Sequence, residues 1–205
     1  PDLRTLATAC EDGSVRLWDL SSGREFARLG QGMPLLATCF SPDGSTLVAA
    51  GVDGHVHRWE MATRTELPSP GGHDAAVRAL AFSPDGLALA SASGDRTVRL
   101  WNLSGAGTPR ALLGHETEVT DVAFDPSGRT LASAGRDGTV RLWNIDTAQE
   151  LAVLEPGLGA VHALAFDAPG HALACGGADG AVRLVRAQSR ARSEEHTSEL
   201  QSRFG

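Results

Sequence analysis

The sequence predicts an all-β fold built from repeated four-stranded antiparallel sheets. Two observations predict it: a pattern that recurs about every 42 residues, and turn sequences that separate short apolar segments within each repeat. The stretch LASAGRDGTVRLWN at 131–144 has close variants at 89–102 and at 6–19. Such internal similarity is typical of repeat architectures, in which each copy is one supersecondary unit.

The period is set by aromatic residues. Phenylalanine recurs every 42 residues, and each copy precedes a turn sequence such as SPDG or DPSG: Phe40, Phe82, Phe124 and Phe166. Tryptophan recurs at intervals of 41, 42 and 42 residues: Trp18, Trp59, Trp101 and Trp143. One further period leads to Val185, in a stretch that otherwise keeps the pattern. The repeat therefore covers most of the chain.

Each unit is expected to contain four strands. In the fourth unit these are residues 119–124, 130–135, 139–144 and 149–154. DPSG follows the first strand, where proline presets φ and glycine tolerates positive φ. An Asp-Gly pair separates the second and third strands and favours a tight hairpin.

A four-stranded sheet of this size cannot bury both of its faces alone, so the units are expected to stack face to face. A period of 40–45 residues with four strands per unit is typical of a β-propeller. Closed propellers use about 4–8 blades. Three complete units and two incomplete ones therefore predict a partial arc, an incomplete ring.

The repeat predicts one propeller region over residues 1–191, with units that end near 29, 70, 113, 154 and 191. Residues 192–205 do not fit the pattern. Their RSEEHTSELQS matches the translation of a sequencing-library adapter, so we expect a non-native tail. A natural solvated tail is the alternative.

The recurring words resemble those of the WD-repeat (WD-40) β-propeller family, here as a fragment of about five repeats. The Gly-His pairs at 72–73 and 114–115 and the Trp-Asp pair at 18–19 are marks of that family, and Trp-Asn at 101–102 and 143–144 are common variants. Several marks recur in register, which makes the resemblance specific.

The resemblance implies a hydrogen-bonded network of His, Ser, Asp and Trp inside each blade. The chemistry is self-consistent, because indole donates to serine, serine to one imidazole nitrogen, and the other imidazole N–H to the carboxylate. Two units carry the full set: His73, Ser91, Asp95 and Trp101, and His115, Ser133, Asp137 and Trp143. The other units carry partial sets: Thr8, Asp12 and Trp18; Asp53 and Trp59; and Asp179 alone. Gln31 and Ala49 replace His and Ser in the second unit, so the second and fifth blades are expected to be less stable.

Other interpretations of these residues are weaker. A Ser-His-Asp set also suggests a hydrolase triad, but it occurs twice and lacks a nucleophile elbow. His55 and His57 share a strand face, as a metal pair would, but no third ligand is near in sequence. Arginine recurs in four of the five units two residues before the Trp position, at most once per unit, which favours a strand-surface feature over a nucleic-acid patch. No phosphate-binding loop, dinucleotide fingerprint or zinc spacing is present, so no catalytic residue, cofactor or metal is expected.

Composition narrows the class further. The formal net charge of −7 argues against nucleic acid as a partner, and no apolar stretch approaches the length of a membrane helix. Three cysteines in strand-like segments (Cys10, Cys39 and Cys175) suggest buried thiols and a cytoplasmic location. The abundance of Ala, Gly and Arg, with no Lys, suggests a GC-rich, bacterial genome.

The resemblance implies a non-enzymatic scaffold for protein–protein interaction, with contacts made by loop residues. Polar loop positions nominate Asp74, Glu116, Glu118 and Arg136, and the acidic residues at 116 and 118 suggest a basic partner surface. One alternative is the sensory or docking propeller of a bacterial multidomain signalling protein, a Ser/Thr kinase or NTPase whose catalytic part is absent here. A propeller hydrolase is the third possibility.

Overall fold

The computed structural model describes residues 4–103 and 108–186. The predicted tail at 192–205 and the expected unit end near 191 lie outside these residues. The described residues form five antiparallel sheets and contain no helix, which confirms the all-β propeller prediction. No helix in this part of the chain could cross a membrane.

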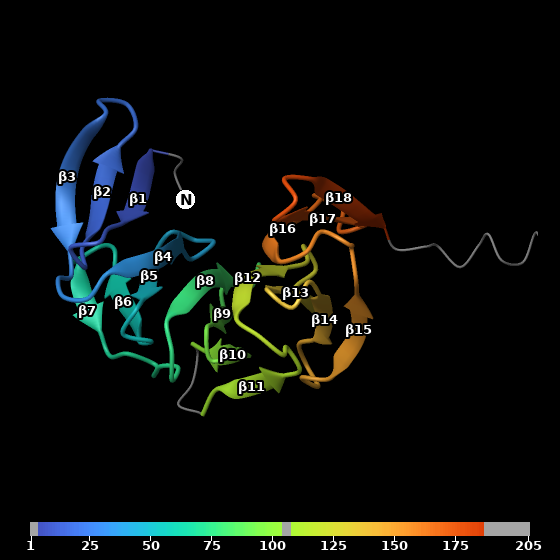
Figure 1. Cartoon of the computed structure of the whole chain (residues 1–205). Helices are drawn as coiled ribbons and strands as arrows, with labels where there is room; N and C mark the ends of the chain where they lie inside the picture. Colours follow the sequence, from blue (N-terminus) through green and yellow to red (C-terminus); the bar gives the residue numbers. More distant parts are fainter. Residues whose placement is uncertain (1–3, 104–107, 187–205) are drawn as a thin grey trace, which may run out of the picture.

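The five sheets, which we call blades 1 to 5, follow one another along the chain in an arc (Figure 1). Blade 1 consists of β1 (Thr5–Ala9), β2 (Val15–Asp19) and β3 (Arg24–Leu29). Blade 2 consists of β4 (Leu35–Phe40), β5 (Thr46–Gly51), β6 (Val56–Glu60) and β7 (Thr65–Leu67). Blade 3 consists of β8 (Val77–Phe82), β9 (Ala88–Ser93), β10 (Thr97–Asn102) and β11 (Arg110–Leu113).

Blade 4 consists of β12 (Val119–Phe124), β13 (Thr130–Gly135), β14 (Val140–Asn144) and β15 (Glu150–Leu154). Blade 5 consists of β16 (Val161–Phe166), β17 (Ala172–Gly177) and β18 (Val182–Arg186). Within each blade, consecutive strands pair with each other. Strands β4, β8, β12 and β16 lie on the inner side of the arc (Figure 1). In the described residues, blades 1 and 5 have three strands, and they leave the arc open between them.

Turns match the sequence pattern. The glycines that end the SPDG-type turns adopt positive φ, for example 72° at Gly128, which only glycine adopts easily. In blade 3 the second hairpin has Asp95-Arg96 where blade 4 has Asp137-Gly138, and Arg96 is forced to a φ of 71°.

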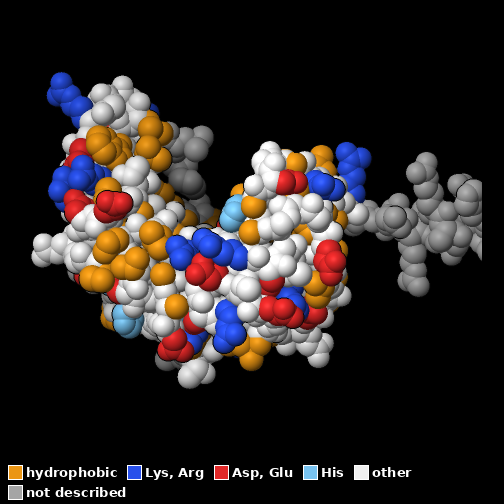
Figure 2. Space-filling view, in the orientation of Figure 1, with side chains coloured by type: hydrophobic (Ala, Val, Ile, Leu, Met, Phe, Trp, Pro, Cys, Tyr) orange, Lys and Arg blue, Asp and Glu red, His pale blue; other side chains and the backbone are white. Residues whose placement is uncertain are grey.

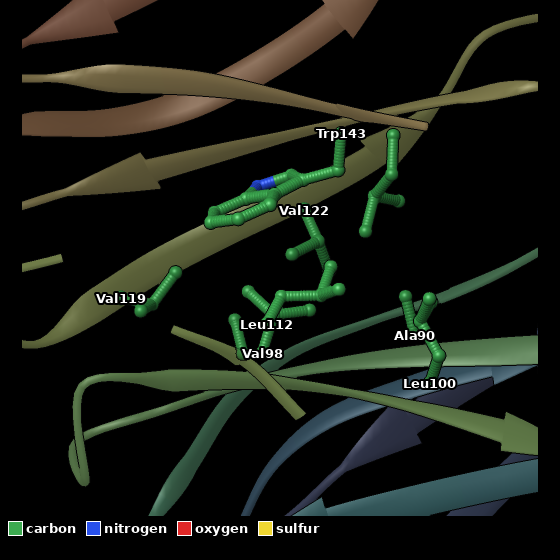
Figure 3. Close-up of a cluster of buried hydrophobic side chains, with 9 residues drawn as sticks. Ala90, Val98, Leu100, Leu112, Val119, Val122 and Trp143 are labelled. Atoms are coloured by element: carbon green, nitrogen blue, oxygen red, sulfur yellow. The ribbon is translucent and has the colours of Figure 1, made fainter. Parts of the chain in front are cut away.

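The hydrophobic core lies between blades rather than inside them. Each interior tryptophan packs against the preceding blade; Trp143, for example, lies over Val98 and Leu112 of blade 3 (Figure 3). Val98 and Leu100 are 0% and 4% exposed. Val182 and Leu184, which occupy the same positions in blade 5, are 71% and 61% exposed. Burial of an apolar strand face therefore depends on the next blade, as expected for stacked repeats.

Candidate functional site

The networks of blades 3 and 4 form where the loop before the first strand of a blade contacts the second and third strands of that blade. In blade 4, Trp143 Nε1 donates to Ser133 Oγ over 2.8 Å, and Ser133 Oγ lies 2.8 Å from His115 Nε2. His115 Nδ1 lies 2.9 Å from Asp137 Oδ2. A proton on Nδ1 satisfies every donor and acceptor in this chain of bonds.

Blade 3 repeats this geometry. Trp101 Nε1 donates to Ser91 Oγ over 2.8 Å, and Ser91 lies 2.7 Å from His73 Nε2. His73 Nδ1 lies 2.8 Å from Asp95 Oδ2. The four residues come from three separate segments, so the network fixes the loop against the strands.

Burial and hydrogen bonding move the pKa values of these groups in opposite directions. Burial is the main effect on His73 and His115 and lowers both pKa values below 6.5, although the neighbouring carboxylates oppose it. Burial acts to raise the pKa of Asp137, but bonds from Thr139, His115 and Glu116 outweigh it and lower the pKa to about 2. The stable form is therefore a neutral imidazole beside an ionised carboxylate.

This arrangement bears on the hydrolase interpretation. Ser91 and Ser133 are completely buried, and both hydroxyl oxygens already accept an indole N–H. Neither serine is open to a substrate. A structural role accounts for every polar atom of the set.

The other blades depart from this pattern. In blade 1, Trp18 Nε1 donates to Thr8 Oγ1 over 3.0 Å, while Asp12 bonds Ser14 and Arg16. In blade 5, Asp179 accepts only the backbone N–H of Ala181 among the described residues.

Blade 2 contains a substitution that sequence reasoning missed. Gln31 occupies the His position but is exposed, and the ring that reaches Asp53 comes from another strand. His57 Nε2 lies 2.8 Å from Asp53 Oδ2, and its Nδ1 lies 3.3 Å from Glu66 Oε1. The available signal was His57 itself, which stands where other units have arginine. In the part of the chain that the structure describes, no three His, Cys, Asp or Glu side chains are grouped to hold a metal.

The predicted protein-binding residues lie on loops at one end of the blades. Asp74 and Glu116 follow the network histidines and are exposed, and their backbone N–H groups donate to Asp95 and Asp137. Glu118 lies 3.3 Å from both Arg136 Nε and an Arg78 nitrogen. Glu118 is therefore not a free acidic group, which weakens the expectation of a basic partner based on residues 116 and 118.

The same end of blade 2 is apolar. Met33, Leu36 and Val52 are 59%, 42% and 38% exposed, and Val52 N bonds Pro34 O. We call these three residues, together with Arg78, Glu118 and Arg136, the loop face. Figure 2 shows apolar side chains over β4–β7 beside charged side chains over β8 and β12.

Comparison with known proteins agrees with this geometry. The family model described as "WD domain, G-beta repeat" matches residues 1–19, 29–60, 64–102, 107–144 and 149–185. A U3 snoRNP-associated protein-like protein, YAO, from Arabidopsis thaliana is 32% identical over 93 residues, which are 36% of this chain and 18% of that protein. Protein groucho from Drosophila melanogaster is 35% identical over 69 residues, which are 33% of this chain and 9% of that protein. The matched segments are thus small parts of both relatives. Because the family model matches most of the chain in five repeats, the chain belongs to the WD-repeat family.

Proposed function

We propose that this chain is a non-catalytic scaffold that binds a protein partner through the loop face. The observation that carries the proposal is the exposed apolar group Met33, Leu36 and Val52 next to paired charges. Protein-binding surfaces combine an apolar centre with a polar rim. WD-repeat domains generally mediate protein–protein interactions, which supports this role.

The charged part of the loop face favours a partner with an acidic group. Two arginines, Arg78 and Arg136, share one carboxylate, Glu118, so the cluster carries a net positive charge. Their side chains are 38% and 55% exposed, which leaves guanidinium N–H groups open to a second acceptor. A partner segment with an apolar side chain beside a carboxylate would fit both parts.

A non-catalytic role is supported by the buried, fully bonded serines of blades 3 and 4. A cytoplasmic location is supported by the thiols, since Cys10, Cys39 and Cys175 are all free. Burial raises the pKa of Cys39 to about 12, which keeps this thiol protonated and unreactive.

The experiment selects peptides that bind the chain from a random display library and measures their affinity for variants. Met33→Asp and Arg136→Glu should each weaken the selected peptides by about tenfold or more, because one removes the apolar contact and the other reverses a charge. The matched control is Leu151→Asp, an equally drastic change at a residue of β15 that is 56% exposed outside the loop face. Undiminished binding to both loop-face variants would contradict the proposal.

A further inference from the structure

Four of the five units share an arginine two residues before the Trp position. In blades 3 and 4 this arginine extends toward the glycine that precedes the network histidine, a space that we call the arginine slot. Arg141 Nη1 donates to Glu150, the residue seven positions after Trp143. The slot passes beneath the glycine that precedes the network histidine, since a Cβ added to Gly114 would lie 2.6 Å from Arg141 Nη1. In blade 3, Arg99 donates to the carbonyl of the equivalent Gly72.

Blade 2 keeps the slot but not the arginine. Position 57 is histidine, whose ring is shorter, while Gly30 and Glu66 stand at the positions of Gly114 and Glu150. The result is a cavity of about 310 Å³ lined in part by Gly30, Trp59 and Glu66. This volume is at the lower end of the range found for ligand cavities.

A second feature of this cavity is an indole N–H that has no hydroxyl acceptor. Trp59 lines it and is 3% exposed as a whole residue, and its indole N–H donates to no hydroxyl among the described residues. The indole N–H groups of Trp18, Trp101 and Trp143 all donate to a hydroxyl. Ala49 replaces the serine in blade 2, so the indole N–H of Trp59 lacks the hydroxyl acceptor that the other blades supply.

The charges around the cavity define the ligand class. Asp53 and Glu66 both line it, and in the part of the chain that the structure describes no arginine does. Among the described residues that line the cavity, only His57 can carry a positive charge, and its ring lies between these two carboxylates. A planar guanidinium can bond carboxylates through several N–H groups and can stack on an indole face.

We propose that this cavity accepts an arginine side chain of a protein partner, which supplies from outside the guanidinium that other blades supply from within. The inference rests on the proposed function, because Met33 belongs to both the loop face and the cavity wall. A partner docked on the loop face would thus reach the cavity. A main-chain carbonyl of the same partner segment supplies an acceptor for the indole N–H.

The test uses Nα-acetyl-L-arginine amide as the probe and the citrulline analogue as its neutral isostere. The chain has four tryptophans, so the indole N–H signals in a ¹⁵N NMR spectrum report on four blades at once. The Trp59 signal, assigned with Trp59→Phe, should shift saturably with the arginine probe. The citrulline analogue should bind at least about tenfold more weakly than the arginine probe. The Trp101 and Trp143 signals should not move. Equal shifts with citrulline, or no saturable shift at Trp59, would overturn the inference.

Two variants and one control complete the design. His57→Arg refills the slot with the residue that other units carry, so it should reduce probe binding at least tenfold. Glu66→Gln should weaken binding, whereas Glu150→Gln makes the same change where the slot is already occupied and should leave it unchanged. Undiminished binding to folded His57→Arg would refute the site. Loss of selected-peptide binding in the loop-face variants is a separate result, so a failure of the cavity inference can be told apart from a failure of the proposed function.

Discussion

The network of blade 4 predicts that Asp137→Ala destabilises the chain much more than Asp179→Ala. Both residues occupy the same position in their repeats, so the pair is matched in sequence context. Asp137 Oδ2 accepts from His115 and the Glu116 backbone N–H, and Oδ1 accepts from the Thr139 backbone and hydroxyl. Asp179 is exposed and accepts one backbone N–H.

The magnitude follows from what each substitution leaves behind. Asp137→Ala leaves the Nδ1–H of His115 without an acceptor, and the His115 side chain is only 1% exposed. A buried donor without a partner costs about 1–3 kcal/mol. The carboxylate is itself only 7% exposed, so solvent cannot easily replace it. Asp179→Ala removes one hydrogen bond at a site where water can substitute. We expect the two losses in the free energy of unfolding to differ by about 1–3 kcal/mol.

Urea unfolding followed by tryptophan fluorescence measures both losses, because Trp143 belongs to the affected network. Asp95→Ala serves as a replicate, since Asp95 bonds His73 in the same way, and it should resemble Asp137→Ala. Equal losses for the Asp137 and Asp179 variants would refute the assignment of the network as an internal brace.

Two further predictions concern pH and backbone strain. The pKa values of His73 and His115 are lowered in the folded chain, so the unfolded chain binds more protons below its own pKa of 6.5. Stability should therefore fall as the pH drops from about 7.5 to about 5.5, and His73→Gln with His115→Gln should flatten that slope in thermal melts. A slope unchanged in the double variant would contradict this origin. Arg96→Gly should raise the free energy of unfolding by about 1 kcal/mol, because Arg96 holds a φ of 71° where blade 4 has glycine. Urea titration measures this free energy of unfolding. Arg129→Gly is the control, because Arg129 is exposed and does not adopt a positive φ, and it should not raise the free energy of unfolding.

Repetition explains why the strands could be predicted from the sequence. In blade 4 the expected strands at 119–124 and 130–135 coincide with β12 and β13. Each segment is one of five related copies, so turn residues and apolar alternation reinforce the same assignment. The contact between blades also follows the period, since Trp143 lies on Val98 of the preceding unit.

The loop face could not be predicted in the same way. The sequence predicts Glu118 as a protein contact but does not predict its ion pairs with Arg78 and Arg136, which come from different blades. Such a pairing depends on how far the inner strands β8 and β12 are rotated about the arc, and no local pattern encodes it. Leu36 and Val52 are likewise ordinary strand and turn residues until the fold leaves them exposed.

Blade 2 shows where the repeat stops being informative. The pattern indicates which residues are lost, namely the histidine and serine at positions 31 and 49, but not what replaces them. In the structure, the His57 ring bonds Asp53, so it replaces the histidine–aspartate bond of the other blades. The space that an arginine fills in blades 3 and 4 is a cavity in blade 2. A repeat tolerates such a change because its neighbours still cover the strand faces. The loss of a structural residue in one copy can therefore create a cavity without the loss of the fold.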